Sequence, residues 1–183
     1  MDIIEIVNQI AHIAHQGQTR RDGETPYITH PIAVRNYVLR AFKEYDASTN
    51  NIQPGTINNL IHLILNNNKY GLNLGELREM TQAIALAHDT KEDNEKITDE
   101  TFIIEFSKNN IPQKKVKIFL ESLDVITKPE GEFYLPYILR VKDNPVTRIV
   151  KFFDITHNFG GLHPAVSFNK MNTYQLAKYI LLN

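Results

Sequence analysis

The sequence contains no cysteine and no tryptophan, and glycine and proline each occur only eight times among its 183 residues. The absence of cysteine excludes disulfide frameworks, thiolate zinc sites and cysteine nucleophiles. Any bound metal must therefore be held by histidine, carboxylate, amide or water ligands, a set that suits Mn, Mg, Fe or Zn. The scarcity of glycine and proline leaves long uninterrupted stretches, which favours helices.

The chain also lacks an excess of charge of one sign and any long apolar segment. Lysine and arginine total 20 against 21 aspartate and glutamate residues, for a net charge of -1. This balance argues against a broad basic face for nucleic acid, while it leaves room for a small pocket that binds one nucleotide. No stretch approaches the roughly 18 apolar residues of a membrane span, and the first residues lack a signal-peptide pattern. We therefore expect a cytoplasmic protein without nucleic-acid or membrane partners.

The length of the chain predicts one domain over residues 1–183, large enough to bury a substantial core. Apolar residues recur at the i, i+3, i+4, i+7 spacing of helices, and no segment alternates as a strand does. We predict an all-α bundle of about eight to nine helices, near 3–14, 31–42, 57–65, 74–90, after Thr98, after Pro112, and near 133–141, 145–154 and 170–182. Thr56 is expected to cap the start of the helix near 57–65.

Two of the polar segments contain residue types that bind metals. His30 lies in PYITHPIAV, just before a predicted helix, and the segment AHDTKEDN contains His88, Asp89, Glu92 and Asp93. On a helix, His88 pairs with Glu92 and Asp89 pairs with Asp93, each four residues on. This spacing predicts one contiguous polar patch near the end of the helix.

A third segment, KFFDITHN, contains Lys151, Asp154 and Asn158, the last two again four residues apart. Together the three segments supply two imidazoles and two carboxylates for one cation, namely His30, His88, Asp89 and Asp154. That donor set suits a divalent ion such as Mn or Fe, with Co and Zn as alternatives, and leaves positions for water and a substrate oxygen. Glu92 and Asp93 would then orient that water or take its proton.

Arg20 and Arg21 lie in the loop that leads to His30, and guanidinium groups recognise phosphate through paired hydrogen bonds. Each feature has a structural explanation when taken alone, because a His-Asp pair is common and an acidic run is usually a solvated helix end. Lys151 fits a phosphate contact and a helix-surface charge equally well. The functional interpretation rests on the occurrence of all three segments in order, with the arginines upstream.

These segments give the chain a resemblance to the HD-domain metal-dependent phosphohydrolases. The likeness is to the short alarmone (ppGpp) hydrolases related to the hydrolase half of the RelA/SpoT proteins. It is carried by AHQGQTRRDGETPYITHPIAV, ALAHDTKEDN and NPVTRIVKFFDITHN, and more weakly by NKMNTYQLAKYIL. The first of these is long and quite specific to this branch, whereas the His-Asp pair is shared by the whole superfamily.

The resemblance implies a reaction and a role for each matching residue. It implies removal of pyrophosphate from the 3′ position of ppGpp or pppGpp to give GDP or GTP, with one ion, usually manganese, on the four predicted ligands. It assigns Glu92 and Asp93 to activation of the attacking water. It places the nucleotide against basic, amide and aromatic side chains, namely Arg20, Arg21, Lys151, Asn158, Tyr137 and Tyr174.

The sequence departs from this family in two regions. The interval from His30 to His88 is longer than usual, and the surplus falls at 43–73, a helical or loop insertion that would form an extra hairpin, a lid or the contact of a homo-oligomer. Gly160 and Gly161 follow Asn158 where the family tends to have a basic residue and threonine, and Ile155 replaces a common arginine. These changes keep two alternatives open: a phosphohydrolase for another nucleotide, such as an adenosine alarmone, and a non-catalytic nucleotide-binding module.

Overall fold

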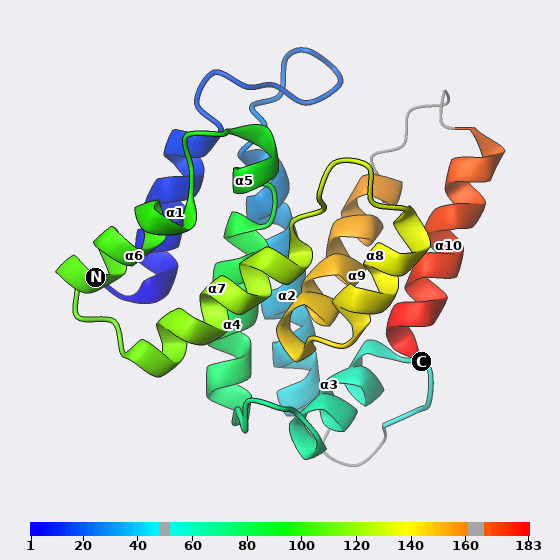
Figure 1. Ribbon diagram of the computed structural model, residues 1–183. Coiled ribbons are helices and arrows are strands. Elements are labelled where there is room, and N and C mark those ends of the chain that lie inside the picture. The colour runs from blue at the N-terminus through cyan, green and yellow to red at the C-terminus, as the bar shows by residue number, and fades with distance from the viewer. Residues whose placement is uncertain (48–51, 161–166) are drawn as a thin grey trace.

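The computed structural model describes residues 1–47, 52–160 and 167–183. Within these residues it contains nine helices of nine residues or more, one helix of four residues and no strand, which confirms the predicted all-α bundle (Figure 1). The helices are α1 (Ile3–Ala14), α2 (Thr29–Ala47), α3 (Ile57–Asn66), α4 (Leu74–Ala87), α5 (Thr90–Asp93), α6 (Asp99–Lys108), α7 (Gln113–Ile126), α8 (Tyr134–Lys142), α9 (Pro145–Gly160) and α10 (Phe168–Leu182).

The helix starts follow local capping chemistry. Asp2 and Glu5 form a reciprocal capping box at the start of α1, and Asn73 and Glu76 form another at the start of α4. The predicted cap of α3 is confirmed, because the Thr56 side chain accepts a hydrogen bond from the Asn59 N–H. These side chains satisfy N–H groups that have no partner inside their own helix.

Three helices have boundaries that differ from the prediction. Helix α2 begins at Thr29, which places His30 in its first turn, and it continues to Ala47 where a loop was expected after residue 42. Helix α9 continues past Asp154 to Gly160. The segment predicted as one helix to residue 90 is broken after Ala87, and the Thr90 hydroxyl donates to the Ala87 carbonyl at 2.7 Å. That side-chain bond competes with helix continuation.

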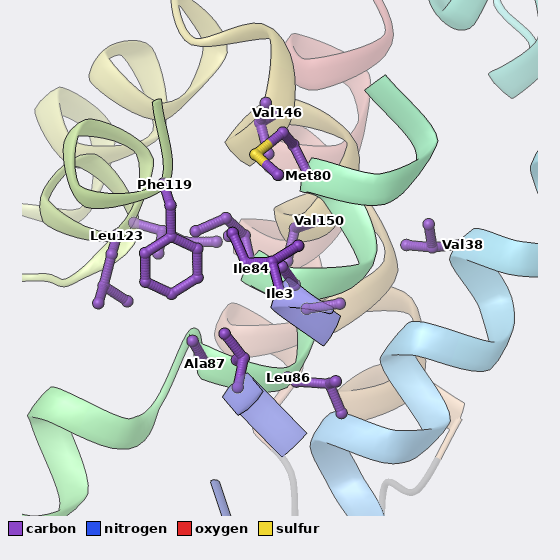
Figure 2. Packing of buried hydrophobic residues seen from close by; sticks show 14 of the residues in the cluster. Ile3, Val38, Met80, Ile84, Leu86, Ala87, Phe119, Leu123, Val146 and Val150 are labelled. Carbon is purple, nitrogen blue, oxygen red and sulfur yellow. The ribbon is translucent and has the colours of Figure 1, made fainter. Parts of the chain in front are cut away.

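Helix α4 is the axis of the bundle. It packs against α1, α2, α7 and α9, and every residue from Met80 to Ala87 is buried. Figure 2 shows its Met80, Ile84, Leu86 and Ala87 among apolar side chains from the surrounding helices, which include Val38, Phe119, Leu123, Val146 and Val150. A helix buried on all sides cannot shift independently of its neighbours. The residues that follow Ala87 are therefore held firmly relative to α2 and α9.

A second, smaller apolar cluster lies between α8, α9 and α10. Its buried members are Tyr137, Ile138, Val141, Ile155, Ala177 and Leu181. Ile155 is 1% exposed there, so the residue that replaces the family's arginine is a core residue in this chain. Gly160 ends α9 at the surface, and a Cβ added to it would meet nothing within 4 Å among the residues that the structure describes. Gly161 lies outside the described residues.

The described part of the predicted insertion contains the end of α2 and the helix α3, and both are built into the bundle. Residues 43–47 extend α2, and α3 packs against α2 and α9 with Leu60 and Ile61 fully buried. The contact lies near the C-terminal end of α2, where the Tyr45 hydroxyl and the His62 imidazole are 3.4 Å apart. Because α2 rises about 1.5 Å per residue, this end is roughly 25 Å from His30. Helix α3 is therefore not a lid over the predicted metal ligands.

Among the residues that the structure describes, no helix combines the length and the apolar character that crossing a bilayer requires.

Candidate metal centre

Three helices bring the predicted metal ligands to one point. His30 lies in the first turn of α2, His88 and Asp89 follow the end of α4, and Asp154 lies within α9. The two imidazoles and Asp154 are between 1% and 4% exposed, so they are removed from water by the packing of the bundle. The Asp89 side chain is 17% exposed, which leaves the cluster open to solvent on its side.

The donor atoms of these residues converge on one another. His30 Nε2 lies 3.3 Å from His88 Nε2, 3.5 Å from Asp89 Oδ2 and 3.1 Å from Asp154 Oδ1. His88 Nε2 lies 3.1 Å from Asp89 Oδ2 and 3.7 Å from Asp154 Oδ1. Ligands about 2.1 Å from one ion lie roughly 3.0 Å apart when adjacent in an octahedron and roughly 3.4 Å apart in a tetrahedron. The spacing therefore fits one shared cation.

The group of His30, His88 and Asp89 can hold a metal ion, since its ligand atoms all lie within 4.8 Å of one another. Two imidazole nitrogens with carboxylate oxygens suit a transition metal better than calcium or magnesium, which prefer oxygen ligands throughout. Asp154, which approaches both imidazoles, extends this set to the four residues predicted from the sequence.

The two histidines are oriented by hydrogen bonds on their other ring nitrogens. His88 Nδ1 lies 2.9 Å from the Ala85 carbonyl oxygen, so it carries a proton that it donates, and Nε2 remains free as a ligand. His30 Nδ1 lies 2.7 Å from His157 Nδ1. Burial and the nearby charges of His30 and Arg20 lower the pKa of His157 to about 4, so its ring is neutral. His157 Nδ1 therefore accepts a hydrogen bond from the N–H of His30 Nδ1.

The two carboxylates are held in a similar way. The Tyr27 hydroxyl donates to Asp89 Oδ2 at 2.8 Å, while the Lys151 ammonium and the Asn158 amide donate to Asp154 at 2.7 and 2.6 Å. Burial raises the pKa of Asp154, but opposing influences, of which the charge of Lys151 is the largest, hold that pKa well below its usual range. Asp154 is therefore an ionised carboxylate in a position to bind a cation.

Glu92 and Asp93 each have a partner outside the four predicted ligands, and the contiguous patch with His88 and Asp89 stays a prediction. Glu92 Oε1 accepts the Lys128 N–H at 2.6 Å, and Asp93 Oδ2 lies 3.7 Å from His15 Nδ1. Desolvation and the charge of Asp89 nevertheless raise the pKa of both carboxyl groups, with the Lys128 N–H opposing this at Glu92. Both therefore lie within electrostatic reach of the metal ligands.

The predicted phosphate-binding residues occupy different positions. Arg20 donates to Asn158 Oδ1 at 3.3 Å, and its guanidinium lies 5.5 Å from the centre of the Tyr27 ring. Asn158 thus links Arg20 to Asp154, which places one arginine at the edge of the cluster. Arg21 is exposed, and its charge acts on the pKa of Tyr174, a half-buried residue of α10.

Tyr137 belongs to the core. It is 2% exposed, and its hydroxyl donates to the Ile126 carbonyl at 2.6 Å. The Lys151 ammonium lies 5.1 Å from the centre of its ring, which gives Lys151 a structural partner in addition to Asp154. The hydroxyl of Tyr137 is thus committed to the fold, and its predicted contact with a substrate stays a prediction.

Tyr27 and Tyr134 were not predicted as site residues. Tyr27 lies within PYITH, three residues before His30, and this position at the start of α2 was the only signal in the sequence. Tyr134 opens α8, far in sequence from every ligand, and no pattern indicates its location. The supporting position of His157 agrees with a structural interpretation of that residue.

The sequence matches no protein-family model and has no significant match among curated proteins.

Proposed function

We propose that this protein is a metal-dependent phosphohydrolase of the HD-domain type that removes pyrophosphate from the 3′ position of ppGpp or pppGpp. The observation that carries the proposal is the convergence of His30, His88, Asp89 and Asp154 from three helices, with their donor atoms at metal-ligand spacing. The order and identity of these residues are those of the family that the sequence resembles. We propose manganese as the ion, with Fe, Co and Zn as the other candidates for this donor set.

A divalent ion bound here supplies Lewis acidity toward a phosphoryl oxygen and toward water. The chain itself supplies the base. Glu92 lies beside the ligands, and its raised pKa makes it a better proton acceptor than an ordinary carboxylate. Its hydrogen bond from the Lys128 N–H fixes one carboxylate oxygen and leaves the other for the attacking water. Asp93, on the next position, adds negative charge that orients the same water.

The substrate is held through its charge. Arg20, which is oriented by Asn158, brings one guanidinium group to the edge of the cluster, and the exposed Arg21 adds a second on the next position of the chain. Their paired N–H groups fit the oxygens of a diphosphate. Tyr174 adds an aromatic surface on the same side, where the charge of Arg21 acts on it. A nucleotide that carries a diphosphate satisfies this combination of positive charge and aromatic surface.

A different nucleotide is the second candidate. The position of Gly160 at the end of α9 offers no side chain, although space is open for one. The family tends to place a basic side chain in this part of the sequence, so this chain has fewer groups that recognise a guanosine nucleotide. An adenosine alarmone also carries the diphosphate that the arginines bind, and its binding needs no groups that recognise guanine.

Turnover of ppGpp by the purified protein with Mn²⁺ tests the proposal. Anion-exchange chromatography should resolve GDP and pyrophosphate as products. Asp89→Asn should abolish turnover by removing a charged ligand. Glu92→Gln should also abolish it but retain metal binding by calorimetry, since Glu92 is not one of the ligands.

The alternatives give different results in the same assay. Release of pyrophosphate from an adenosine substrate but not from ppGpp would favour the second candidate. Tight, metal-dependent nucleotide binding without any product, unchanged in Glu92→Gln, would indicate a binding module. Turnover retained by Asp89→Asn would contradict metal-dependent hydrolysis at this cluster.

A further inference from the structure

Two tyrosines at the start of α8 differ in how their hydroxyl groups are used. Tyr137 donates its hydroxyl to the Ile126 carbonyl at 2.6 Å. The Tyr134 hydroxyl oxygen is also buried, but it has no hydrogen-bond partner in the part of the chain that the structure describes. The two rings lie side by side, 6.2 Å between centres. A buried hydroxyl without a partner is uncommon and destabilises the folded state.

Tyr134 is linked to the metal centre through Tyr137, because the centres of the two rings are 6.2 Å apart and the Lys151 ammonium lies 5.1 Å from the centre of the Tyr137 ring. It packs against the cluster formed by α8, α9 and α10, together with Phe152 and Tyr174, and Figure 1 shows these three helices beside one another. Besides desolvation, the influences on its pKa are the charges of Lys151 and Asp154 and the neighbouring Tyr174 and Tyr137. Lys151 and Asp154 form an ion pair at 2.7 Å, and Asp154 is one of the predicted metal ligands.

Packing alone does not account for this hydroxyl. Phenylalanine would fill the same space in the cluster without burying an unpaired polar group. Where a buried polar group near a candidate site has no partner among the described residues, a bound ligand is the natural source of that partner. A ligand that supplies the missing hydrogen bond recovers the free energy lost by burying the group. The chemistry of the surroundings then decides which ligand can supply it.

We propose that Tyr134 is a substrate-binding residue, whose hydroxyl donates to a phosphoryl oxygen of the bound nucleotide. The inference rests on the proposed function for its ligand. A cation at the four ligands and the Lys151 ammonium make this region attractive to an anion. The phenol, whose pKa is raised chiefly by burial, stays protonated and is therefore a donor. Because this oxygen is out of contact with water, the side chains that cover it must move for it to meet a ligand.

Tyr134→Phe tests this proposal through two independent measurements. Without nucleotide, the melting temperature of Tyr134→Phe should equal or exceed that of the wild type, because the variant removes only an unpaired group. Tyr137→Phe should melt at a lower temperature, because it removes a paired one. With the metal-loaded protein, Tyr134→Phe should weaken binding of inorganic pyrophosphate and raise the KM for ppGpp about 10- to 100-fold, the worth of one hydrogen bond to a charged group, with kcat little changed. Tyr179→Phe, on an exposed tyrosine of α10, is the matched control and should change none of these values.

The outcomes separate this inference from the proposed function. Wild-type protein that binds pyrophosphate but does not hydrolyse ppGpp overturns the proposed function, and the pyrophosphate affinity of Tyr134→Phe then decides the role of Tyr134. A drop in melting temperature as large as that of Tyr137→Phe overturns the inference, since it reveals a partner within the fold. Unchanged pyrophosphate affinity and KM in Tyr134→Phe also overturn it. Wild-type protein that binds neither pyrophosphate nor ppGpp overturns both proposals.

Discussion

At its N-terminal end, α2 places His30 beside a second histidine and two carboxylates, whereas toward its C-terminal end Phe42 and Ala41 pack into the same apolar cluster as Leu60 of α3. Both regions are buried, but only the second gains from burial alone. Burying charged and polar groups at the first costs free energy that hydrogen bonds and ion pairs only partly recover. One end of the helix therefore stabilises the fold, whereas the other end places binding groups whose burial that stability offsets.

The largest effect should come from a metal ligand. Manganese at about 100 times its Kd should stabilise the wild type by about 2.7 kcal/mol and raise the melting temperature by roughly 5–10 °C. Asp89→Asn should abolish this shift and reduce metal affinity by more than the 10- to 100-fold typical of residues that only orient ligands. Asp46→Asn, the same change on a half-exposed carboxylate near the other end of α2, should leave the shift intact. Scanning fluorimetry with and without a chelator would measure both, and equal responses would erase the contrast between the two ends.

The next largest effect is expected where the C-terminal end of α2 packs against α3. Leu60→Ala should lower the free energy of unfolding by about 2–5 kcal/mol, because a fully buried leucine leaves a cavity. Metal affinity of the folded fraction should not change, since α3 lies far from the ligands. Leu63→Ala on the same helix, at a side chain that is 49% exposed, should cost only about 0.5 kcal/mol or less. Urea denaturation together with calorimetric metal titration would test this, and a large loss of metal affinity in Leu60→Ala would show that the two ends are coupled.

A smaller effect is expected at the edge of the metal centre. Tyr27→Phe removes the hydroxyl that donates to Asp89 Oδ2, so metal affinity should fall about 10- to 100-fold while the fold is retained. Calorimetric titration with Mn²⁺ or Zn²⁺ would measure the change. An affinity equal to that of the wild type would mean that Asp89 is oriented without Tyr27.

The smallest effect should come from a helix cap. Asn73→Ala removes one half of the capping box of α4 and should destabilise the protein by about 1 kcal/mol, with metal affinity unchanged. Asn73→Ser should restore most of that stability, because serine also caps helices well. Thermal denaturation of the two variants would decide, and failure of serine to rescue would exclude capping as the cause.

Much of the fold could be predicted because its helices are signalled locally. The apolar spacing of α1 and α7 and the cap at Thr56 are properties of neighbouring residues, and these predictions are confirmed. The break after Ala87 could not be predicted, because it depends on side-chain bonds such as that of Thr90. The four candidate metal ligands were predicted from their residue types and order, and the structure brings their donor atoms together.

Other parts of the site depend on packing between distant segments and have no local signal. The hydroxyl of Tyr137 reaches a carbonyl of α7, which no spacing in the sequence indicates. Tyr134 and Tyr137 are the same residue type, three positions apart on one helix, and only their neighbours distinguish a paired hydroxyl from an unpaired one. Sequence reasoning therefore named the ligands more readily than the residues around them.

The predicted metal ligands come from widely separated parts of the chain, since His88 lies 58 positions after His30 and Asp154 lies 124 positions after it. In the unfolded chain only His88 and Asp89 are neighbours, and two ligands bind a cation weakly. The complete set exists only after α2 and α9 have both docked on α4, which is a late event when contacts span long loops. Measuring metal binding during refolding would therefore report when α2 and α9 have both docked on α4. The ion would act as a kinetic reporter that needs no added label.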